Sequence, residues 1–503
     1  MPQSAQKEDG KVTRPPVVGI FGHIDHGKSS LIDYIRETNI TEKEAGGITQ
    51  HVGAYEVSRV RKDGRMTKLT LLDTPGHAAF ENVRNRGTRV ADIAVLIVSA
   101  EDGVKPQTLE SFKYIKENAL PMMVAITKTD KPAADILRAK QTLAENSIFV
   151  EGYGGDTPVV ALSAKTGEGV EEFLDMIELM AQMEHLEGEP EAFGSGIVIE
   201  SSLDAKRGIA AVGIIKNGTV RRGTFAASGD AFVPIRFILD AAGNTVEELS
   251  LSSPVKLIGW DKLPPIGREF VTFLKKEDAL AYIEKQKSRA ADKEEQPKTA
   301  EGVTLLPIIL KADTAGSLEA VEGELKKITR ERIAPKVIVS GVGSVNENDV
   351  KTAIATTGAV IVGFNVKIDA PALSLSERSG VKILSFGVIY ELTDKVIELV
   401  AEREPKVEIE EITGSAKVLK IFSGGKGKQV LGARVITGSF SRGAMVKIIR
   451  REAEIGRGKL KELQQAKAAV NTVNEGTEFG AMVESKMEAA PGDTLQGVVL
   501  ATK

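Results

Sequence analysis

One eight-residue segment near the N-terminus, GHIDHGKS at 22–29, constrains the fold of this chain more than any other. It matches G-x-x-x-x-G-K-[ST], follows the apolar run VVGIF (Val17–Phe21) and precedes the helical pattern SLIDYIRE. In that setting, the loop amides and the N-terminus of the following helix face phosphate groups. The segment therefore predicts a phosphate-binding loop between the first strand and the first helix of an α/β domain.

Apolar runs and helix-length stretches continue to alternate up to residue 183. The later runs are LTLLD (69–73), IAVLIVSA (93–100), MMVAIT (122–127) and PVVALS (158–163). They are short and rich in β-branched residues, which is typical of buried strands of a parallel sheet. We therefore predict a doubly wound α/β domain with a mainly parallel sheet over residues 15–183.

The pattern divides the rest of the chain into further domains. Short strands with Gly-rich turns predict β-barrels, strand and helix patterns predict an α/β/α domain, and charged stretches without an apolar face predict linkers. Asn346 with Asp349 predicts the N-cap of a helix that begins at Glu347. The expected boundaries are a β-barrel at 184–284, a linker at 285–302, an α/β/α domain at 303–390, a helical linker at 391–408 and a C-terminal β-barrel at 409–503.

Composition excludes several classes of protein. The 503 residues include no cysteine, which rules out disulfides, thiolate zinc sites, iron–sulfur clusters and a Cys nucleophile. Without a signal peptide or an apolar run near 18 residues, the chain is expected to be cytoplasmic and to have no membrane contact. The polar residues 1–14 predict a disordered tail. The net charge is −4, yet residues 413–503 carry 15 Lys and Arg against 8 Asp and Glu. This basic region fits a local polyanion contact, and a solvated basic face is the equal alternative.

Three motifs identify the ligand of the first domain. Lys28 is placed to reach the β- and γ-phosphates and Ser29 to bind Mg²⁺, while Asp73 begins DTPGH (73–77) at a strand end. TKTD (127–130) and SAK (163–165) also follow strands, where ligands bind in such sheets. A carboxylate such as Asp130 can accept both guanine N1–H and N2–H₂, so the motifs together predict a GTP-binding domain. The predicted nucleotide contacts are Gly22, His23, Ile24, Asp25, His26, Gly27, Lys28, Ser29, Ser30, Asp73, Gly76, Thr127, Lys128, Asp130, Ser163, Ala164 and Lys165.

These motifs resemble those of the translational GTPases, and the wider sequence resembles bacterial-type translation initiation factor two. The segments that carry the resemblance are GGITQHVGAY (46–55), the stretch from DTPGH to residue 108, GVGSVNENDV (341–350) and GFNVKIDA (363–370). The resemblance covers essentially residue 17 to the C-terminus, with an α/β domain between two barrels.

The resemblance implies a GTPase that works on the ribosome. Ser29, Thr49 and Asp73 would hold Mg²⁺, and His77 would orient the attacking water, with Lys28 and Asp25 as the other catalytic groups. Asp25 would bind a monovalent cation, and Ile24 with Ile48 would form an apolar gate against His77. The implied factor is a monomer that hydrolyses GTP to GDP slowly alone. It binds formylmethionyl initiator tRNA on the small subunit, promotes joining of the large subunit, and works with other initiation factors.

The sequence departs from the family pattern at several positions. Thr127 replaces the usual Asn of the guanine motif, and a long N-terminal extension is almost absent, so contacts made through it are not expected. In the tRNA-binding barrel Lys467, Glu478 and Gly480 match the family. Gln464, Gln465 and Phe479 do not. Phe479 would either narrow the pocket or stack on an end group.

Two other classes stay open. The first is a tRNA-delivering elongation-type GTPase, which lacks an α/β domain such as residues 303–390 between its barrels. The second is a ribosome-binding assembly factor with a silent nucleotide site, against which the intact residues Lys28, Ser29, Thr49, Asp73 and His77 argue.

Overall fold

The computed structural model of the chain divides into two compact units, Met1–Arg403 and Glu404–Lys503, which are described separately. No helix in the described part of the chain is long and apolar enough to span a membrane. The described residues are 10–37, 49, 52–60, 64–204, 206–290, 304–328, 332–404, 408–425, 427–466 and 468–502.

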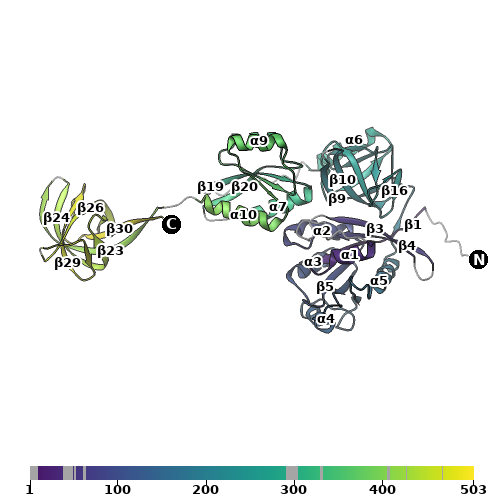
Figure 1. Cartoon of the computed structure of the whole chain (residues 1–503), viewed down its shortest axis with the longest axis horizontal. Helices are drawn as coiled ribbons and strands as arrows, with labels where there is room; N and C mark the ends of the chain where they lie inside the picture. The colour runs from purple at the N-terminus through teal and green to yellow at the C-terminus, as the bar shows by residue number, and fades with distance from the viewer. Residues whose placement is uncertain are drawn as a thin grey trace, which may run out of the picture. The chain divides into compact units, whose positions relative to one another are not determined.

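The first unit begins with the domain that Figure 1 marks by β3, β4 and β5. Its six-stranded sheet has the order β3-β4-β2-β5-β6-β7. All neighbouring strands are parallel except β3, which runs antiparallel to β4. The strands are β2 (Val17–Gly22), β3 (Gly53–Val60), β4 (Met66–Asp73), β5 (Ile93–Ser99), β6 (Met122–Thr127) and β7 (Val159–Ala161). The predicted α/β fold class is confirmed, and the sheet is mixed because of the β3 edge strand.

Helices cover both faces of this sheet, which explains why its strands are apolar on both sides. Leu31 and Phe173 represent the helices packed on one face, and Ile115 and Leu143 those packed on the other. The carboxyl ends of the parallel strands therefore open together at one edge. The helices are α1 (Lys28–Arg36) and α5 (Val170–Met183) on the first face, and α2 (Glu81–Val90), α3 (Pro106–Glu117) and α4 (Ile136–Glu145) on the second.

A β-barrel domain follows in the same unit. Its eight-stranded sheet has the order β13-β12-β18-β9-β10-β17-β14-β15, and β11 pairs with β16 beside it. Trp260 and Phe270 fill its core. The strands are β9 (Ser195–Asp204), β10 (Gly208–Asn217), β11 (Thr219–Arg221), β12 (Phe225–Ser228), β13 (Ala231–Pro234), β14 (Ile238–Leu239), β15 (Thr245–Val246), β16 (Glu248–Ser250), β17 (Pro254–Trp260) and β18 (Glu269–Phe273).

The two segments that flank this barrel differ from the sequence expectation. Part of the predicted tail is ordered, because β1 (Val12–Thr13) pairs with β8 (Glu187–Gly188); residues 1–9 lie outside the described residues. The predicted linker begins inside a helix, since α6 (Lys276–Ala290) packs Ala279 and Ile283 against Ala227 of the barrel. Residues 291–302 also lie outside the described part.

A buried carboxylate joins the N-terminal segment, the first domain and the barrel. Asp92 accepts two hydrogen bonds from Arg14, at 2.6 and 2.7 Å, and one from Lys216 at 2.6 Å. Burial alone would raise the pKa of Asp92, but the hydrogen bond from Arg14 and the charge of Lys216 outweigh it and lower that pKa. The stability that the cluster contributes is therefore present above the ordinary Asp pKa and is lost as the pH falls through the lower folded value.

Asp92→Asn is expected to lower the free energy of unfolding at pH 7 by about 3–5 kcal/mol, because it leaves two cations without their carboxylate. Urea denaturation followed by the fluorescence of Trp260, the single tryptophan, measures this change. Asp230→Asn is the control, since its partner Lys262 is exposed and such pairs contribute about 1 kcal/mol or less. The difference for Asp92→Asn should shrink below about pH 4. Equal urea midpoints for Asp92→Asn and the wild type at pH 7 would contradict the assignment.

The third domain of the first unit has an α/β/α architecture. Its parallel sheet has the order β20-β19-β21-β22, with α7 and α10 on one face and α8 and α9 on the other. The predicted cap of α8 is present: Asn346 accepts from the amide of Asp349, whose carboxylate accepts from the amide of Asn346. The elements are β19 (Thr304–Ala312), β20 (Ile333–Val342), β21 (Val360–Phe364), β22 (Ile383–Phe386), α7 (Ala315–Lys327), α8 (Glu347–Ala355), α9 (Ala370–Ser379) and α10 (Ile389–Glu402).

The segment expected as a helical linker, 391–408, is mostly part of this domain. Leu392, Val396 and Leu399 of α10 are buried in the core that covers one face of the sheet. An amphipathic helix needs an apolar partner, and this sheet face supplies one. The helix therefore ends the α/β/α domain rather than leading out of it; residues 405–407 lie outside the described residues.

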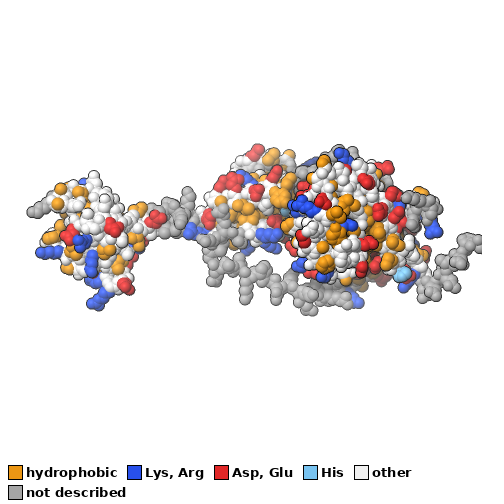
Figure 2. Space-filling view, turned by 90° about the horizontal axis from the view of Figure 1, so that it is seen from below, with side chains coloured by type: hydrophobic (Ala, Val, Ile, Leu, Met, Phe, Trp, Pro, Cys, Tyr) orange, Lys and Arg blue, Asp and Glu red, His pale blue; other side chains and the backbone are white. Residues whose placement is uncertain are grey.

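The second unit is a closed β-barrel, as the fold prediction requires. Its strands follow the order β23-β30-β25-β26-β29-β24, and pairing of β23 with β24 closes the cylinder. The strands are β23 (Glu408–Gly425), β24 (Lys428–Ser441), β25 (Met445–Arg450), β26 (Ala453–Gln465), β27 (Ala468–Ala469), β28 (Thr472–Asn474), β29 (Glu478–Ser485) and β30 (Thr494–Thr502). Figure 2 shows Lys and Arg side chains gathered on one side of this unit, in keeping with its basic sequence.

Candidate nucleotide site

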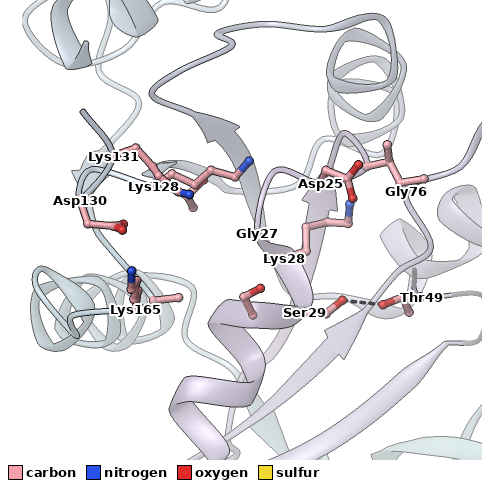
Figure 3. A pocket seen from close by; sticks show the side chains of 14 residues that line it. Asp25, Gly27, Lys28, Ser29, Thr49, Gly76, Lys128, Asp130, Lys131 and Lys165 are labelled. Carbon is pink, nitrogen blue, oxygen red and sulfur yellow. Dashed lines mark hydrogen bonds between the residues drawn. The ribbon is translucent and has the colours of Figure 1, made fainter. Parts of the chain in front are cut away.

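A hollow of about 340 Å³ opens where the parallel strands of the first domain end (Figure 3). It brings together residues from the phosphate-loop, DTPGH, TKTD and SAK motifs, together with Thr49. Lys131 also lines it and was not predicted. The predicted residues Gly22, His23, His26, Asp73 and Ser163 do not line the hollow. The lining residues are Ile24, Asp25, Gly27, Lys28, Ser29, Ser30, Thr49, Gly76, Thr127, Lys128, Asp130, Lys131, Ala164 and Lys165.

The loop from β2 to α1 requires its glycines. Gly22 has φ +145°, and a Cβ there would lie 2.5 Å from the carbonyl oxygen of Ile97. A Cβ at Gly76 would lie 3.0 Å from the backbone nitrogen of Ile24 and 2.5 Å from the mobile end of Lys28, so a glycine lets the DTPGH segment approach the loop without displacing either. The close approach leaves the backbone of Gly76 facing the phosphate end of the hollow (Figure 3).

Lys28 is the buried cation of the hollow. Lys28 is the first residue of α1. Its Nζ donates to the carbonyl oxygens of Gly22 at 3.0 Å and His23 at 2.6 Å. Burial lowers the pKa of Lys28 to about 8. A phosphate group would supply the negative charge that this buried ammonium lacks.

Three oxygen donors meet beside Lys28. Ser29 Oγ lies 2.5 Å from Thr49 Oγ1 and 2.9 Å from Oδ2 of Asp73, and Thr49 Oγ1 lies 3.3 Å from the same Oδ2, so two hydroxyl protons serve three close oxygen contacts. Oδ1 of Asp73 is buried without a hydrogen-bond partner among the described residues. Burial raises the pKa of Asp73 to about 6. A set of hydroxyl and carboxylate oxygens with an unpartnered carboxylate atom fits Mg²⁺, a hard cation that prefers oxygen ligands.

Asp130 stands at the other end of the hollow, where a base would lie (Figure 3). Its Oδ1 accepts a hydrogen bond of 2.7 Å from Ser163, and Ser163 Oγ accepts from the amides of Lys165 and Thr166. The hydrogen bond from Ser163 lowers the pKa of Asp130, which keeps the carboxylate charged. Ser163 therefore acts from behind the lining by orienting Asp130.

Thr127, which replaces the family's Asn, braces the phosphate loop. Its hydroxyl donates to the carbonyl oxygen of His26 at 2.6 Å, inside the loop. The imidazole of His26 is buried and its Nδ1 accepts from the amide of Ser99 at 3.3 Å. The side chain of His26 is thus part of the wall beneath the loop.

Thr127→Val should weaken GDP binding about 3- to 10-fold, because it removes the hydroxyl that holds the loop carbonyl while keeping the side-chain volume. Titration of a fluorescent GDP analogue measures the dissociation constant. Thr166→Val is the matched control at an exposed position of the neighbouring loop. Equal affinities for wild type and Thr127→Val would show that the bond does not support the loop.

His77, the expected water-orienting residue, lies outside the hollow. Nδ1 accepts from the amide of Ala79 at 2.8 Å and caps the short helix η3 (Ala78–Phe80), while the ring contacts Tyr390 of the third domain. Burial lowers the pKa of His77 to about 4, so the imidazole is neutral. Ile24 of the expected gate lines the hollow, and Ile48 lies outside the described residues. A catalytic role for His77 therefore requires its side chain to move.

Sequence reasoning missed the group that holds the DTPGH segment. Arg84 is fully buried in α2 and donates to the carbonyl oxygens of Pro75, at 3.2 Å, and His77, and to Glu110 at 2.7 Å. Arg84 lies in the stretch from DTPGH to residue 108 that carries the resemblance, but no role was assigned to it, because that role depends on how α2 folds back over the loop. Burial lowers the pKa of this guanidinium, and Glu110 partly offsets that effect.

The predicted tRNA residues of the second unit are only partly gathered. Glu478, Phe479 and Gly480 line an open hollow with Phe422 and Gln464. Phe479 is buried, and its ring stacks on Phe440 in the barrel core with centroids 5.9 Å apart. The side chain of Phe479 therefore belongs to the barrel core more than to the wall of the hollow. Lys467 lies outside the described residues.

A phosphate loop, three oxygen donors beside it and an oriented carboxylate at the carboxyl ends of parallel strands define a P-loop nucleotide-binding domain. Comparison with protein families agrees in three places. Residues 14–183 match the elongation factor Tu GTP binding domain, 194–273 match elongation factor G domain 2, and 281–397 match translation-initiation factor 2.

Whole-chain comparisons extend this likeness. Translation initiation factor IF-2 from Nitratiruptor sp. is 40% identical over 98% of this chain and 59% of its own length, and IF-2 from Aquifex aeolicus is 39% identical over 96% and 61%. GDP-bound aIF5B from Aeropyrum pernix aligns with a TM-score of 0.45 at 24% identity, over 97% of this chain and 92% of its own. Over nearly its whole length, the chain is thus similar to IF-2, which confirms the resemblance. It spans about three fifths of the length of these curated relatives.

Proposed function

We propose that this chain is a GTP-dependent translation initiation factor. It binds formylmethionyl initiator tRNA on the small ribosomal subunit, promotes joining of the large subunit, and hydrolyses GTP. The observation that carries the proposal is one chain in which a segment that matches translation-initiation factor 2, 281–397, packs on Phe80 and Val83, just after the DTPGH motif. The same first domain holds a hollow lined by the phosphate-loop and guanine motifs.

The nucleotide site performs binding and charge neutralisation. Lys28 and the loop amides hold the phosphates, and Ser29, Thr49 and Asp73 hold Mg²⁺, which neutralises the β- and γ-oxygens when bound. Asp130 reads the guanine edge through two accepted hydrogen bonds. Asp25, with φ +59° in the loop, is the proposed ligand of a monovalent cation.

The hydrolytic step needs a water beside the γ-phosphate and a group that orients it. His77 is proposed for this role once the ribosome turns it toward the hollow. Loss of the γ-phosphate then releases Thr49 and Gly76, and the segments that carry them relax. That change of state lets the factor leave the joined ribosome.

The second unit is the proposed holder of the initiator tRNA. Its open hollow with Glu478 and Gly480 would receive the formylmethionyl end, and its basic surface would meet phosphates. Lys467 is proposed as a further contact. The factor would act as a cytoplasmic monomer, together with other initiation factors.

Competition binding tests the initiation role. The full chain is titrated with formylmethionyl initiator tRNA and with an elongator aminoacyl-tRNA, with and without GTP. A preference for the formylated initiator supports the proposal. Equal affinity for the two tRNAs would mean that the second unit does not select the initiator. Only the proposed GTP binding and hydrolysis would then stand.

Two alternatives have weaker support. An elongation-type GTPase is disfavoured by the α/β/α domain, whose segment 281–397 matches translation-initiation factor 2. An assembly factor with a silent site is disfavoured because Lys28, Ser29 and Thr49 line one hollow. Asp73 accepts a hydrogen bond from Ser29 beside it. GTP turnover in the presence of ribosomes distinguishes the silent site from the active one.

A further inference from the structure

The imidazole of His77 is covered by a residue of another domain. Its ring centroid lies 4.0 Å from that of Tyr390, the second residue of α10, and the two rings are tilted by 58°. His77 is 5% exposed, whereas Tyr390 is 49% exposed. The tyrosine is thus a lid whose outer side faces solvent and whose inner side rests on the histidine.

The surrounding interface holds this contact in place. Phe80 and Val83, which follow His77 along the chain, are buried in the core of the α/β/α domain. Glu319 of α7 accepts from Asn82 at 2.7 Å and forms an ion pair with Arg86. The α/β/α domain therefore contacts the segment after His77 through both apolar packing and polar bonds. The contact between His77 and Tyr390 is part of this interface.

In this position the imidazole of His77 does not reach the nucleotide hollow. Nδ1 is used by the amide of Ala79, and Nε2 is buried without a hydrogen-bond partner among the described residues. Gly76, one residue earlier, lines the nucleotide hollow, whereas His77 does not. The backbone thus reaches the phosphate end of the hollow while the imidazole is turned toward the third domain.

We propose that Tyr390 is a positioning residue that holds His77 away from the nucleotide hollow, so that GTP hydrolysis requires α10 to release the histidine. This inference rests on the proposed function, and it adds that α10 is the element that restrains His77. The restraint is the packing of the ring, since the two tilted rings lie against each other and, among the described residues, no hydrogen bond involves the tyrosine hydroxyl. Phenylalanine should therefore replace tyrosine without loss, and alanine should not.

The expected change in the rate of GTP hydrolysis follows from the strength of the ring contact between His77 and Tyr390. Aromatic pairs of this kind shift an equilibrium by about 2- to 10-fold. Removing the ring should raise the fraction of molecules whose His77 is free by that factor. The rate of GTP hydrolysis without ribosomes should rise with it, while nucleotide affinity should not change, because Tyr390 does not line the hollow.

Single-turnover GTP hydrolysis by the full chain, without ribosomes, tests the proposal. Tyr390→Ala should raise the single-turnover rate constant about 2- to 10-fold at unchanged nucleotide affinity, and Tyr390→Phe should match the wild type. Lys395→Ala is the control, because it removes only an exposed pair with Glu398 on the same helix. The double variant His77→Ala, Tyr390→Ala should lose the gain. A rate for Tyr390→Ala at or below that of the folded wild type, or a gain that survives His77→Ala, would overturn the proposal.

A second readout does not depend on activity. NMR titration of the His77 ring, assigned with His77→Ala, should move its pKa from about 4 toward the ordinary value when Tyr390 becomes Ala, since the ring regains water. The charged groups that face His77, namely Glu324, Arg84 and Lys327, are unchanged in that variant. No hydrolysis by the wild type even with ribosomes would overturn the proposed function. An unmoved His77 pKa would overturn the lid itself.

Discussion

Replacing Asp130 with asparagine is expected to change the preferred nucleotide from GDP to xanthosine diphosphate. The carboxylate is proposed to accept N1–H and N2–H₂ of guanine, and Ser163 holds it in place through a hydrogen bond of 2.7 Å. Xanthine keeps N1–H but carries a carbonyl oxygen at position 2, so an amide with one acceptor and one donor complements it. GDP affinity should fall about 100- to 10,000-fold, because polar groups of the base and the site then lack partners.

Titration of GDP and xanthosine diphosphate against wild type and Asp130→Asn measures this exchange. Asp156→Asn is the control, since Asp156 is an exposed residue of the same domain and does not line the hollow. Retained preference of Asp130→Asn for GDP would mean that another group reads the base, and the orientation assigned to Ser163 would have no purpose.

Replacing His77 with alanine is expected to lower ribosome-stimulated GTP hydrolysis about 100- to 10,000-fold, the usual contribution of a positioned acid–base or water-orienting group. GDP binding should stay within about 2-fold of the wild type, because His77 does not line the hollow. Rapid-quench hydrolysis with saturating ribosomes and a parallel GDP titration separate the two effects.

His185→Asn is the matched control for that measurement. His185 is an exposed histidine of the same unit, far along the chain from the DTPGH segment. Hydrolysis by His77→Ala within about 3-fold of the wild type would assign the orientation of water to another group and would remove the reason for a lid over this residue.

The nucleotide site was predictable because its parts are contiguous motifs on parallel strands. Lys28 and Ser29 follow β2 directly. Asp130 and Ser163 follow β6 and β7, which are adjacent parallel strands, so their meeting follows from the sheet order. The α/β, barrel, α/β/α and barrel order was likewise readable from periodicity.

Contacts between domains were not predictable in the same way. Tyr390 meets His77 only because the α/β/α domain docks on η3 and α2, which no local pattern encodes. Arg14 looked like part of a polar tail, yet it pairs with Asp92 inside the first unit. The apolar face of α10 would also be expected in a linker helix that packs on some other domain. In the structure this face covers the sheet of its own α/β/α domain, so the helix belongs to that domain.

The rate of GTP hydrolysis by the full wild-type chain, measured with and without ribosomes, tests the central claim most directly. A complete nucleotide site whose histidine is turned away should hydrolyse GTP slowly alone and at least about 100-fold faster on the ribosome. Equal rates in the two conditions would contradict the account, because the histidine would then have no restraint for the ribosome to remove.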